Sequence, residues 1–177
     1  MPKYVVFLRA INVGGHTIKM DYLRHLFEAM GFSNVETFIA SGNVIFDSTS
    51  KSIKALERKI EDSLQETLGY RVATFIRTTF ELTDIAHYKP FKASDSEGNA
   101  LYIAFIADAP SDEAIQKLLS FTTDIDEFHV AGREIYWLCR KKSSESEFSG
   151  ALLEKTLGLP ATLRNSTTVK KIASKYS

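Results

Sequence analysis

Cysteine is nearly absent from this chain of 177 residues. Cys139 is the only one, so no disulfide can form within the chain, and a reducing compartment is its natural environment. It ends the apolar pattern Tyr136-Trp137-Leu138-Cys139, which is typical of a buried strand. We therefore expect a buried thiol rather than a nucleophile, and we predict a cytoplasmic protein.

Long apolar runs and an excess of one charge are also missing. No run approaches the ~18–20 apolar residues that a membrane span requires. The apolar stretch between Lys3 and Arg9 is too short for the apolar region of a signal peptide. The chain has 22 basic and 22 acidic residues, so its formal net charge is zero. This balance implies no general attraction to nucleic acid or to an anionic membrane.

The common catalytic templates are missing as well. The four histidines, His16, His25, His87 and His129, are scattered without the spacing of metal ligands, and no cysteine pair accompanies them. Gly14-Gly15 belongs to neither a phosphate-binding loop with Gly-Lys-Ser/Thr nor a dinucleotide fingerprint. No Gly-x-Ser-x-Gly turn is present, and no spacing singles out a pair of carboxylates. We predict no metal site and no cofactor.

Hydrophobic periodicity and turn residues predict the same order of elements in both halves. The first half is expected to contain the strand Tyr4–Arg9, the helix Met20–Met30, the strands Val35–Ala40 and Asn43–Asp47 around Ser41-Gly42, a helix from Ile53 that ends at Gly69, and the strand Val72–Arg77. The second half is expected to contain the strand Leu101–Ile106, a helix capped by Ser111, the strands Phe128–Val130 and Glu134–Cys139, a helix that ends at Gly158, a strand over 161–164, and a terminal helix capped by Asn165 or Ser166.

This order predicts an α+β protein of two tandem ferredoxin-like (βαββαβ) subdomains with antiparallel sheets and a C-terminal helix. The boundaries are predicted at 1–78 and 100–177, joined by a helix and a polar loop over 79–99. Strands such as Tyr4–Arg9 are apolar on both faces, so both faces require a cover. The two subdomains packing together would supply one, and a homodimer would supply another.

Small and polar residues gather where the first strand and the first hairpin are expected to meet. In a ferredoxin-like sheet, Arg9, Asn12 and Gly14-Gly15 lie near Ser41, Gly42 and Asn43. The Arg9 guanidinium and the glycine amides suit a phosphate or a carboxylate. The same residues also have structural interpretations. The glycines supply positive φ, Ser41-Gly42 makes the hairpin, and Arg9 pairs with a carboxylate such as Asp47.

Three blocks of the chain resemble the signature blocks of a widespread, mainly bacterial family that is known only as a domain of unknown function, number sixteen ninety-seven. They are Phe7–Gly15, Phe38–Phe46 and Leu157–Val169, and the resemblance covers essentially the whole chain. It implies paired ferredoxin-like subdomains and no established activity or cofactor. The family's recurrent polar positions fall on Arg9, Asn12, Gly14, Gly15, Ser41, Gly42, Asn43, Arg77, Arg164, Asn165 and Thr168.

The chain departs from that family pattern at three positions. Ala10 stands where glycine is usual, and Ser166 stands where tryptophan is usual. Glu147 stands where lysine is usual, so a charge is inverted before the helix at 149–157. These departures affect the C-terminal block more than the N-terminal blocks.

Three functions compete. The first is binding of a small anionic ligand at Arg9, Gly14-Gly15 and Ser41–Asn43, with Arg77, Arg164 and Asn165 as further candidates and an enzymatic role left open. The second is RNA binding, because aromatic residues such as Phe7 and Phe46 could stack on bases. The third is a non-catalytic interaction or regulatory module that works through apolar sheet faces. The strand Val44–Asp47 ends in an acid and the net charge is zero, which disfavours RNA.

Overall fold

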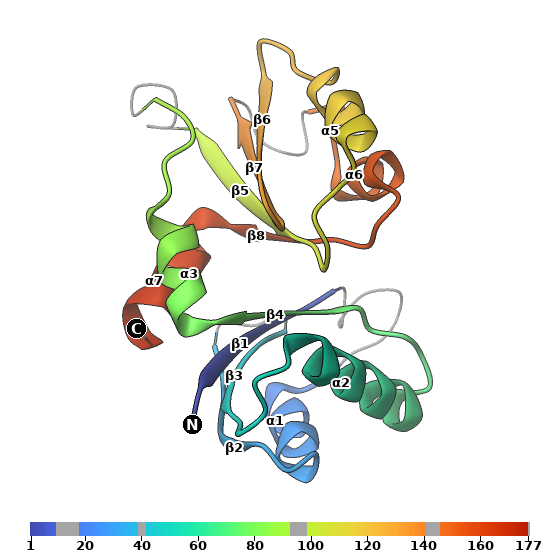
Figure 1. Cartoon of the computed structure of the whole chain (residues 1–177), viewed down its shortest axis with the longest axis vertical. Helices are drawn as coiled ribbons and strands as arrows, with labels where there is room; N and C mark the ends of the chain where they lie inside the picture. The colour runs from blue at the N-terminus through green and yellow to red at the C-terminus, as the bar shows by residue number, and fades with distance from the viewer. Residues whose placement is uncertain (10–17, 39–41, 93–98, 141–145, 177) are drawn as a thin grey trace. The chain divides into compact units, whose positions relative to one another are not determined.

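The computed structural model describes residues 1–9, 18–38, 42–92, 99–140 and 146–176 (Figure 1). Two compact units make up the chain. Unit 1 comprises Met1–Thr83 and Ile172–Ser177, and unit 2 comprises Asp84–Lys171. The division falls inside helix α3 (Thr79–His87), and the end of helix α7 (Ser166–Tyr176) belongs to unit 1.

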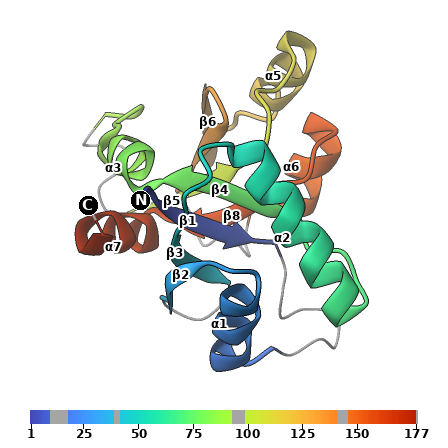
Figure 2. The same cartoon turned by 60° about the horizontal axis from the view of Figure 1, so that its bottom comes forward.

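Unit 1 contains a four-stranded antiparallel sheet in the order β2-β3-β1-β4. Its elements before α3 are β1 (Lys3–Leu8), α1 (Met20–Ala29), β2 (Ser33–Thr37), β3 (Asn43–Asp47), α2 (Ile53–Leu68) and β4 (Thr74–Thr78). Helices α1 and α2 lie on one face of this sheet in both views (Figure 1, Figure 2). Leu23 and Phe27 of α1 pack with Ile60 of α2 against Val6 and Phe46 of the sheet, which gives the unit its core.

Unit 2 repeats this arrangement with a second antiparallel sheet in the order β6-β7-β5-β8. Its elements between α3 and α7 are β5 (Ala100–Phe105), α5 (Asp112–Leu119), β6 (Asp126–Ala131), β7 (Glu134–Cys139), α6 (Gly150–Leu157) and β8 (Thr162–Asn165). Leu118 of α5 and Leu153 of α6 belong to the same core cluster as Ile135 and Trp137 of β7. Cys139 is buried there and forms no disulfide, as predicted.

The predicted cap Ser111 and the predicted helix ends at Gly69 and Gly158 are confirmed, and Ser52 and Ser149 are two further caps. Ser52, Ser111 and Ser149 each accept a hydrogen bond from the backbone N–H three residues later, at 3.2 Å. Gly69 and Gly158 follow α2 and α6 in the left-handed conformation, with φ of +83° and +69°. These signals fixed the helix positions, so the α+β class, with two antiparallel four-stranded sheets and a C-terminal helix, is confirmed.

The second strand differs from its prediction. It was expected over Val35–Ala40, whereas β2 spans Ser33–Thr37 and so begins earlier; Ile39 and Ala40 lie outside the described residues. The pairing of β2 with β3 shifts in register between Ser33 and Glu36, and Asn34 within this irregularity has a φ of +51°. A bulge of this kind adds an unpaired residue to one strand and shifts the alternation of its side chains, so the alternation pattern of the sequence does not reveal the pairing at Ser33. Within the described ranges, no helix has the length and hydropathy of a membrane span.

Candidate functional site

The predicted residues at the end of β1 are described only in part. Phe7 pairs with Asn43, and the Leu8 N–H donates to the Gly42 carbonyl at 2.9 Å, so the end of β1 lies beside the start of β3. Arg9 follows β1 and is exposed, and its backbone N–H donates to the Ala73 carbonyl at 2.9 Å. The predicted candidates Asn12, Gly14, Gly15 and Ser41 lie outside the described residues.

Gly42 and Asn43 have structural duties in the hairpin. Gly42 has a φ of +83°, which favours glycine. Asn43 is buried, and its side-chain amide donates to the Phe38 carbonyl at 3.0 Å. The suggested pairing of Arg9 with Asp47 is wrong. Asp47 lies at the other end of β3 and is held by Lys3 at 3.1 Å and Asn34 at 2.8 Å.

Arg77 and Arg164 occupy corresponding places in the two sheets. Arg77 pairs with Val5 of β1, and Arg164 pairs with Ile103 of β5. Each guanidinium donates through Nη1, at 2.9 Å, to the carbonyl of the residue before it. Arg164 also donates to Thr162 Oγ1 at 2.7 Å. Burial lowers the pKa of Arg164 to about 10, so this side chain remains a cation at neutral pH.

The helices that follow these arginines begin differently. Before α3, the Glu81 N–H donates to Thr78 Oγ1 at 2.9 Å, and the Thr78 N–H donates to Glu81 Oε1 at 3.0 Å, so a carboxylate closes the first turn. Glu81 follows Arg77 by four residues. The residue that follows Arg164 by the same number is Thr168, in the first turn of α7. Thr168 brings no carboxylate, and the first turn of α7 contains no acidic residue to offset the positive end of the helix dipole.

Asn165 is the cap of α7, one of the two caps that the sequence suggested. Its side-chain Oδ1 accepts a hydrogen bond from the Thr167 N–H at 2.9 Å. The other candidate, Ser166, is thereby left as the first residue of the helix with its hydroxyl available. Asn165 is exposed, whereas Ser166 is only 9% exposed.

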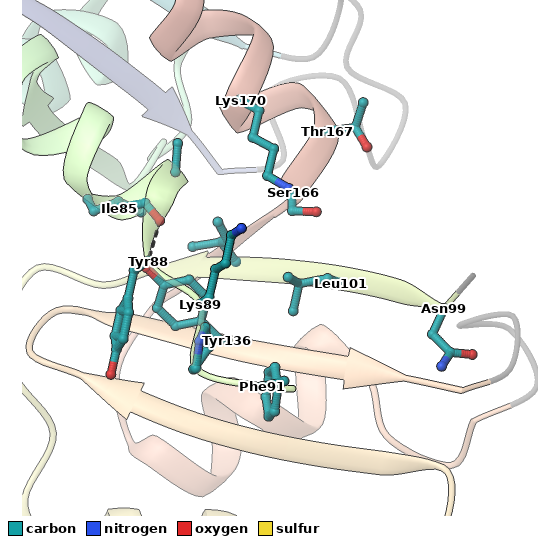
Figure 3. Close-up of a pocket in the computed structure, with 13 residues that line it drawn as sticks. Ile85, Tyr88, Lys89, Phe91, Asn99, Leu101, Tyr136, Ser166, Thr167 and Lys170 are labelled. Atoms are coloured by element: carbon teal, nitrogen blue, oxygen red, sulfur yellow. Dashed lines mark hydrogen bonds between the residues drawn. The ribbon is translucent and has the colours of Figure 1, made fainter. Parts of the chain in front are cut away.

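A cavity of about 390 Å³ lies at the start of α7 within unit 2 (Figure 3). Its lining comes from the end of α3 and the segment after it, from β5 and β7, and from the first turn of α7. The lining residues are Ile85, Ala86, Tyr88, Lys89, Pro90, Phe91, Asn99, Leu101, Ile103, Tyr136, Ser166, Thr167 and Lys170. We call it the α7 cavity.

One side of the α7 cavity is cationic. The ammonium ends of Lys89 and Lys170 point into the same space, beside the Ser166 hydroxyl (Figure 3). Neither lysine forms an ion pair with any residue that the structure describes, and no described residue hydrogen-bonds the Ser166 side chain. Ser166 is 9% exposed, and its hydroxyl is therefore available to a ligand or water that reaches the cavity.

The aromatic side of the α7 cavity is fixed by hydrogen bonds. The Tyr136 hydroxyl donates to the Ile85 carbonyl at 2.9 Å, and burial raises the pKa of this phenol, with Glu134 and Tyr88 adding to the increase. The Tyr88 hydroxyl bonds His129 Nε2 at 2.8 Å, and the Tyr88 and Tyr136 rings meet edge to face with centroids 5.4 Å apart. These hydroxyls are used within the protein, so the rings offer the cavity apolar surface.

The sequence did not single out Tyr88, Lys89 or Lys170. These residues belong to segments far apart in the chain, and each looks like an ordinary surface residue by itself. One signal was available. An apolar residue, an arginine and two polar residues occur twice in this order, each time directly before or at the start of a helix. The two stretches are Ile76-Arg77-Thr78-Thr79 and Leu163-Arg164-Asn165-Ser166. This repeat marks the start of α7 as a site to compare with α3.

The two sheets with helices define an α+β protein, and comparison with known proteins assigns it to a family. A family model described as "Protein of unknown function (DUF1697)" matches residues 1–136, and the chain belongs to this family. The match ends before the third resembling block, Leu157–Val169.

The fold is also found in a solved structure. The structure of the conserved bacterial protein SP0830 from Streptococcus pneumoniae is similar, with a TM-score of 0.76 and 24% sequence identity. The similarity covers 98% of this chain and 97% of that chain. No curated protein matches the chain.

Proposed function

We propose that this protein binds a small anionic ligand, carrying a phosphate or a carboxylate, in the α7 cavity. The observation that supports this most is the convergence of Lys89 and Lys170 on the hydroxyl of Ser166, a residue with 9% exposure at the start of α7. Two cations, a hydroxyl donor and the positive end of a helix form a site of complementary charge for an anion. The ligand class is the one that the sequence suggested at Arg9, and the proposed place is different.

RNA binding has less support. Phe7 and Phe46, the two rings suggested for base stacking, are both buried. A stacking platform needs aromatic faces that single-stranded bases can reach. A small ligand requires only a cavity of the size that the α7 cavity provides.

The proposal is tested by thermal unfolding with inorganic phosphate, citrate and chloride at constant ionic strength. At ten times its dissociation constant, a ligand stabilises by about 1.4 kcal/mol, which raises the midpoint by roughly 3–6 °C in a chain of this size. We expect this stabilisation with phosphate or citrate and not with chloride. The Lys89→Met/Lys170→Met double variant should lose it.

Two single variants serve as controls. Lys171→Met removes the same charge from the next position of α7, which does not line the cavity, and should respond like the wild type. Arg9→Ala tests the site that the sequence suggested and should also keep the response. If no anion stabilises the wild type, or if Arg9→Ala loses the response while the double lysine variant keeps it, the α7 cavity is the wrong place.

We also propose that the two units are ferredoxin-like repeats that arose by duplication, with subdomains near the predicted boundaries 1–78 and 100–177. Their strand orders correspond element by element. A shared detail adds support. Glu61 of α2 accepts the Thr74 N–H at 3.1 Å, and Glu154 of α6 accepts the Ala161 N–H at 2.9 Å. Thr74 and Ala161 each lie three residues before the corresponding arginine.

A cytoplasmic location is part of the proposal, supported by the single buried cysteine in a chain without disulfides. Fractionation of cells that express the protein from its own promoter would test it. Recovery outside the cytoplasmic fraction would contradict it.

A further inference from the structure

The α7 cavity is divided into a polar and an apolar part, and this division says what kind of anion it fits. Lys89, Lys170 and Ser166 lie together on one side, and Phe91, Leu101 and the Tyr136 ring lie away from their polar ends (Figure 3). An inorganic ion would use only the first group. The apolar side chains of the remaining lining would then stay in contact with water, which is unfavourable.

Two aromatic residues of this lining, Tyr88 and Tyr136, are held in place before any ligand arrives. Tyr88 is bonded to His129 on β6, and Tyr136 is bonded to the backbone of α3. Their edge-to-face contact, with an interplanar angle of 78°, restrains both rings. Rings that are already ordered lose little conformational freedom on contact with a ligand, so they favour a flat apolar group.

The volume agrees with a ligand that has two parts. About 390 Å³ is within the range of small-molecule sites, roughly 300–1,000 Å³, and exceeds what a single phosphate or carboxylate needs. We infer that the α7 cavity binds a phosphate monoester attached to a planar ring, the chemical class to which mononucleotides belong. The phosphate would lie between Lys89 and Lys170 at Ser166, and the ring would lie against Phe91, Leu101 and the Tyr136 ring. This inference rests on the proposed anion site.

Calorimetric titration of the full chain with methyl phosphate, phenyl phosphate and adenosine 5′-monophosphate tests the inference. The three share the phosphate monoester, and only the last two carry a planar ring. We expect phenyl phosphate and the nucleotide to bind at least tenfold more tightly than methyl phosphate. Adenosine, which has the ring without the phosphate, should bind more weakly than the nucleotide by a similar factor.

Variants separate the two parts of the site. Phe91→Ala should weaken the binding of phenyl phosphate about tenfold and leave the binding of methyl phosphate unchanged. Phe80→Ala, at a residue of unit 1 that is 81% exposed, should change neither affinity. Midpoints of thermal unfolding without ligand show whether each variant is folded. Equal affinities for all three esters would overturn the ring inference and leave the anion site standing. Absence of binding by every ester and by phosphate would overturn both.

Discussion

Ser166 combines burial with an unused hydroxyl, and this sets it apart from the other serines that begin helices. Ser52, Ser111 and Ser149 each accept a backbone hydrogen bond as caps. Ser166 has no such duty, because Asn165 caps α7. Its side chain faces the lysine pair of the α7 cavity (Figure 3). A residue of this kind contributes little to folding and can contribute much to binding.

We therefore expect Ser166→Ala to weaken phosphate binding without lowering stability. A hydrogen bond to a charged group contributes about 1.5–3 kcal/mol, so the dissociation constant should rise at least tenfold. Calorimetric titration measures the affinity, and urea unfolding measures the stability. Ser174→Ala, at an exposed position of the same helix, should change neither. A variant that unfolds more easily and binds normally would show that Ser166 is structural.

Asp47, the last residue of β3, makes a pH-dependent contribution to the stability of the chain. Burial by itself would raise its pKa, but hydrogen bonds from Asn34 and Lys3 and the charge of Lys3 outweigh it, so the pKa lies below its ordinary 3.8. A lowered pKa in the folded state means that the charged form stabilises the fold. This stabilisation is present above the unfolded pKa and is lost as pH falls through the folded pKa.

We expect Asp47→Asn to be less stable than the wild type at pH 7 and to approach it as the pH falls below the ordinary pKa of 3.8. Urea unfolding at a series of pH values measures this difference. Lys3→Met removes one of the two partners of Asp47 and should reduce the pH-dependent part of the free energy of unfolding. A difference between Asp47→Asn and the wild type that stays constant down to pH 2 would contradict the assignment.

Strands β4 and β8 have backbone N–H groups that are bonded in the same way, by carboxylates of the preceding helix. Each is the last strand of its sheet, so one row of its backbone groups has no neighbouring strand within that sheet. Carboxylates from the preceding helix accept some of these N–H groups. Glu61 and Glu57 of α2 hold Thr74 and Ile76, and Glu154 of α6 holds Ala161.

Glu61→Leu and Glu154→Leu should each destabilise the chain by about 1–3 kcal/mol, because a partly buried N–H loses its acceptor. Gln at either position retains an oxygen acceptor and should restore most of the loss. Urea unfolding gives both values. An effect at only one of the two positions would weaken the case for a shared, duplicated device.

Local sequence signals predicted the elements well, and long-range sites poorly. Leu23 and Phe27, four residues apart, mark one helix face, and Gly158 marks a helix end without reference to the rest of the chain. The proximity of Lys89 and Lys170 depends on how the segment after α3 and the start of α7 come together beside β5 and β7. No pattern within a short window contains that information, so the cavity was found only in three dimensions.

At the scale of the whole molecule, the two halves share a strand order and differ at their final helices. In one half, Glu81 closes the first turn of α3. In the other, Thr168 leaves the first turn of α7 without a carboxylate, next to two lysines that line a cavity. One helix start is thus closed by a side chain of the protein, and the other lies beside the lysines to which we assign the anion.

The balanced charge of the whole chain separates a small-ligand site from an RNA-binding surface. RNA affinity draws largely on phosphate contacts and falls with salt in proportion to their number, whereas the α7 cavity offers two lysines. With 22 basic and 22 acidic residues, we expect no measurable binding of a single-stranded RNA at 50 or 200 mM salt. Fluorescence anisotropy with a labelled 20-nucleotide RNA tests this, in parallel with phosphate titration at the same two salt concentrations. Phosphate affinity should change only a few-fold over this range. An RNA affinity that falls steeply with salt would show that the chain concentrates its cations on an extended surface, and RNA would then replace the small anion as the ligand.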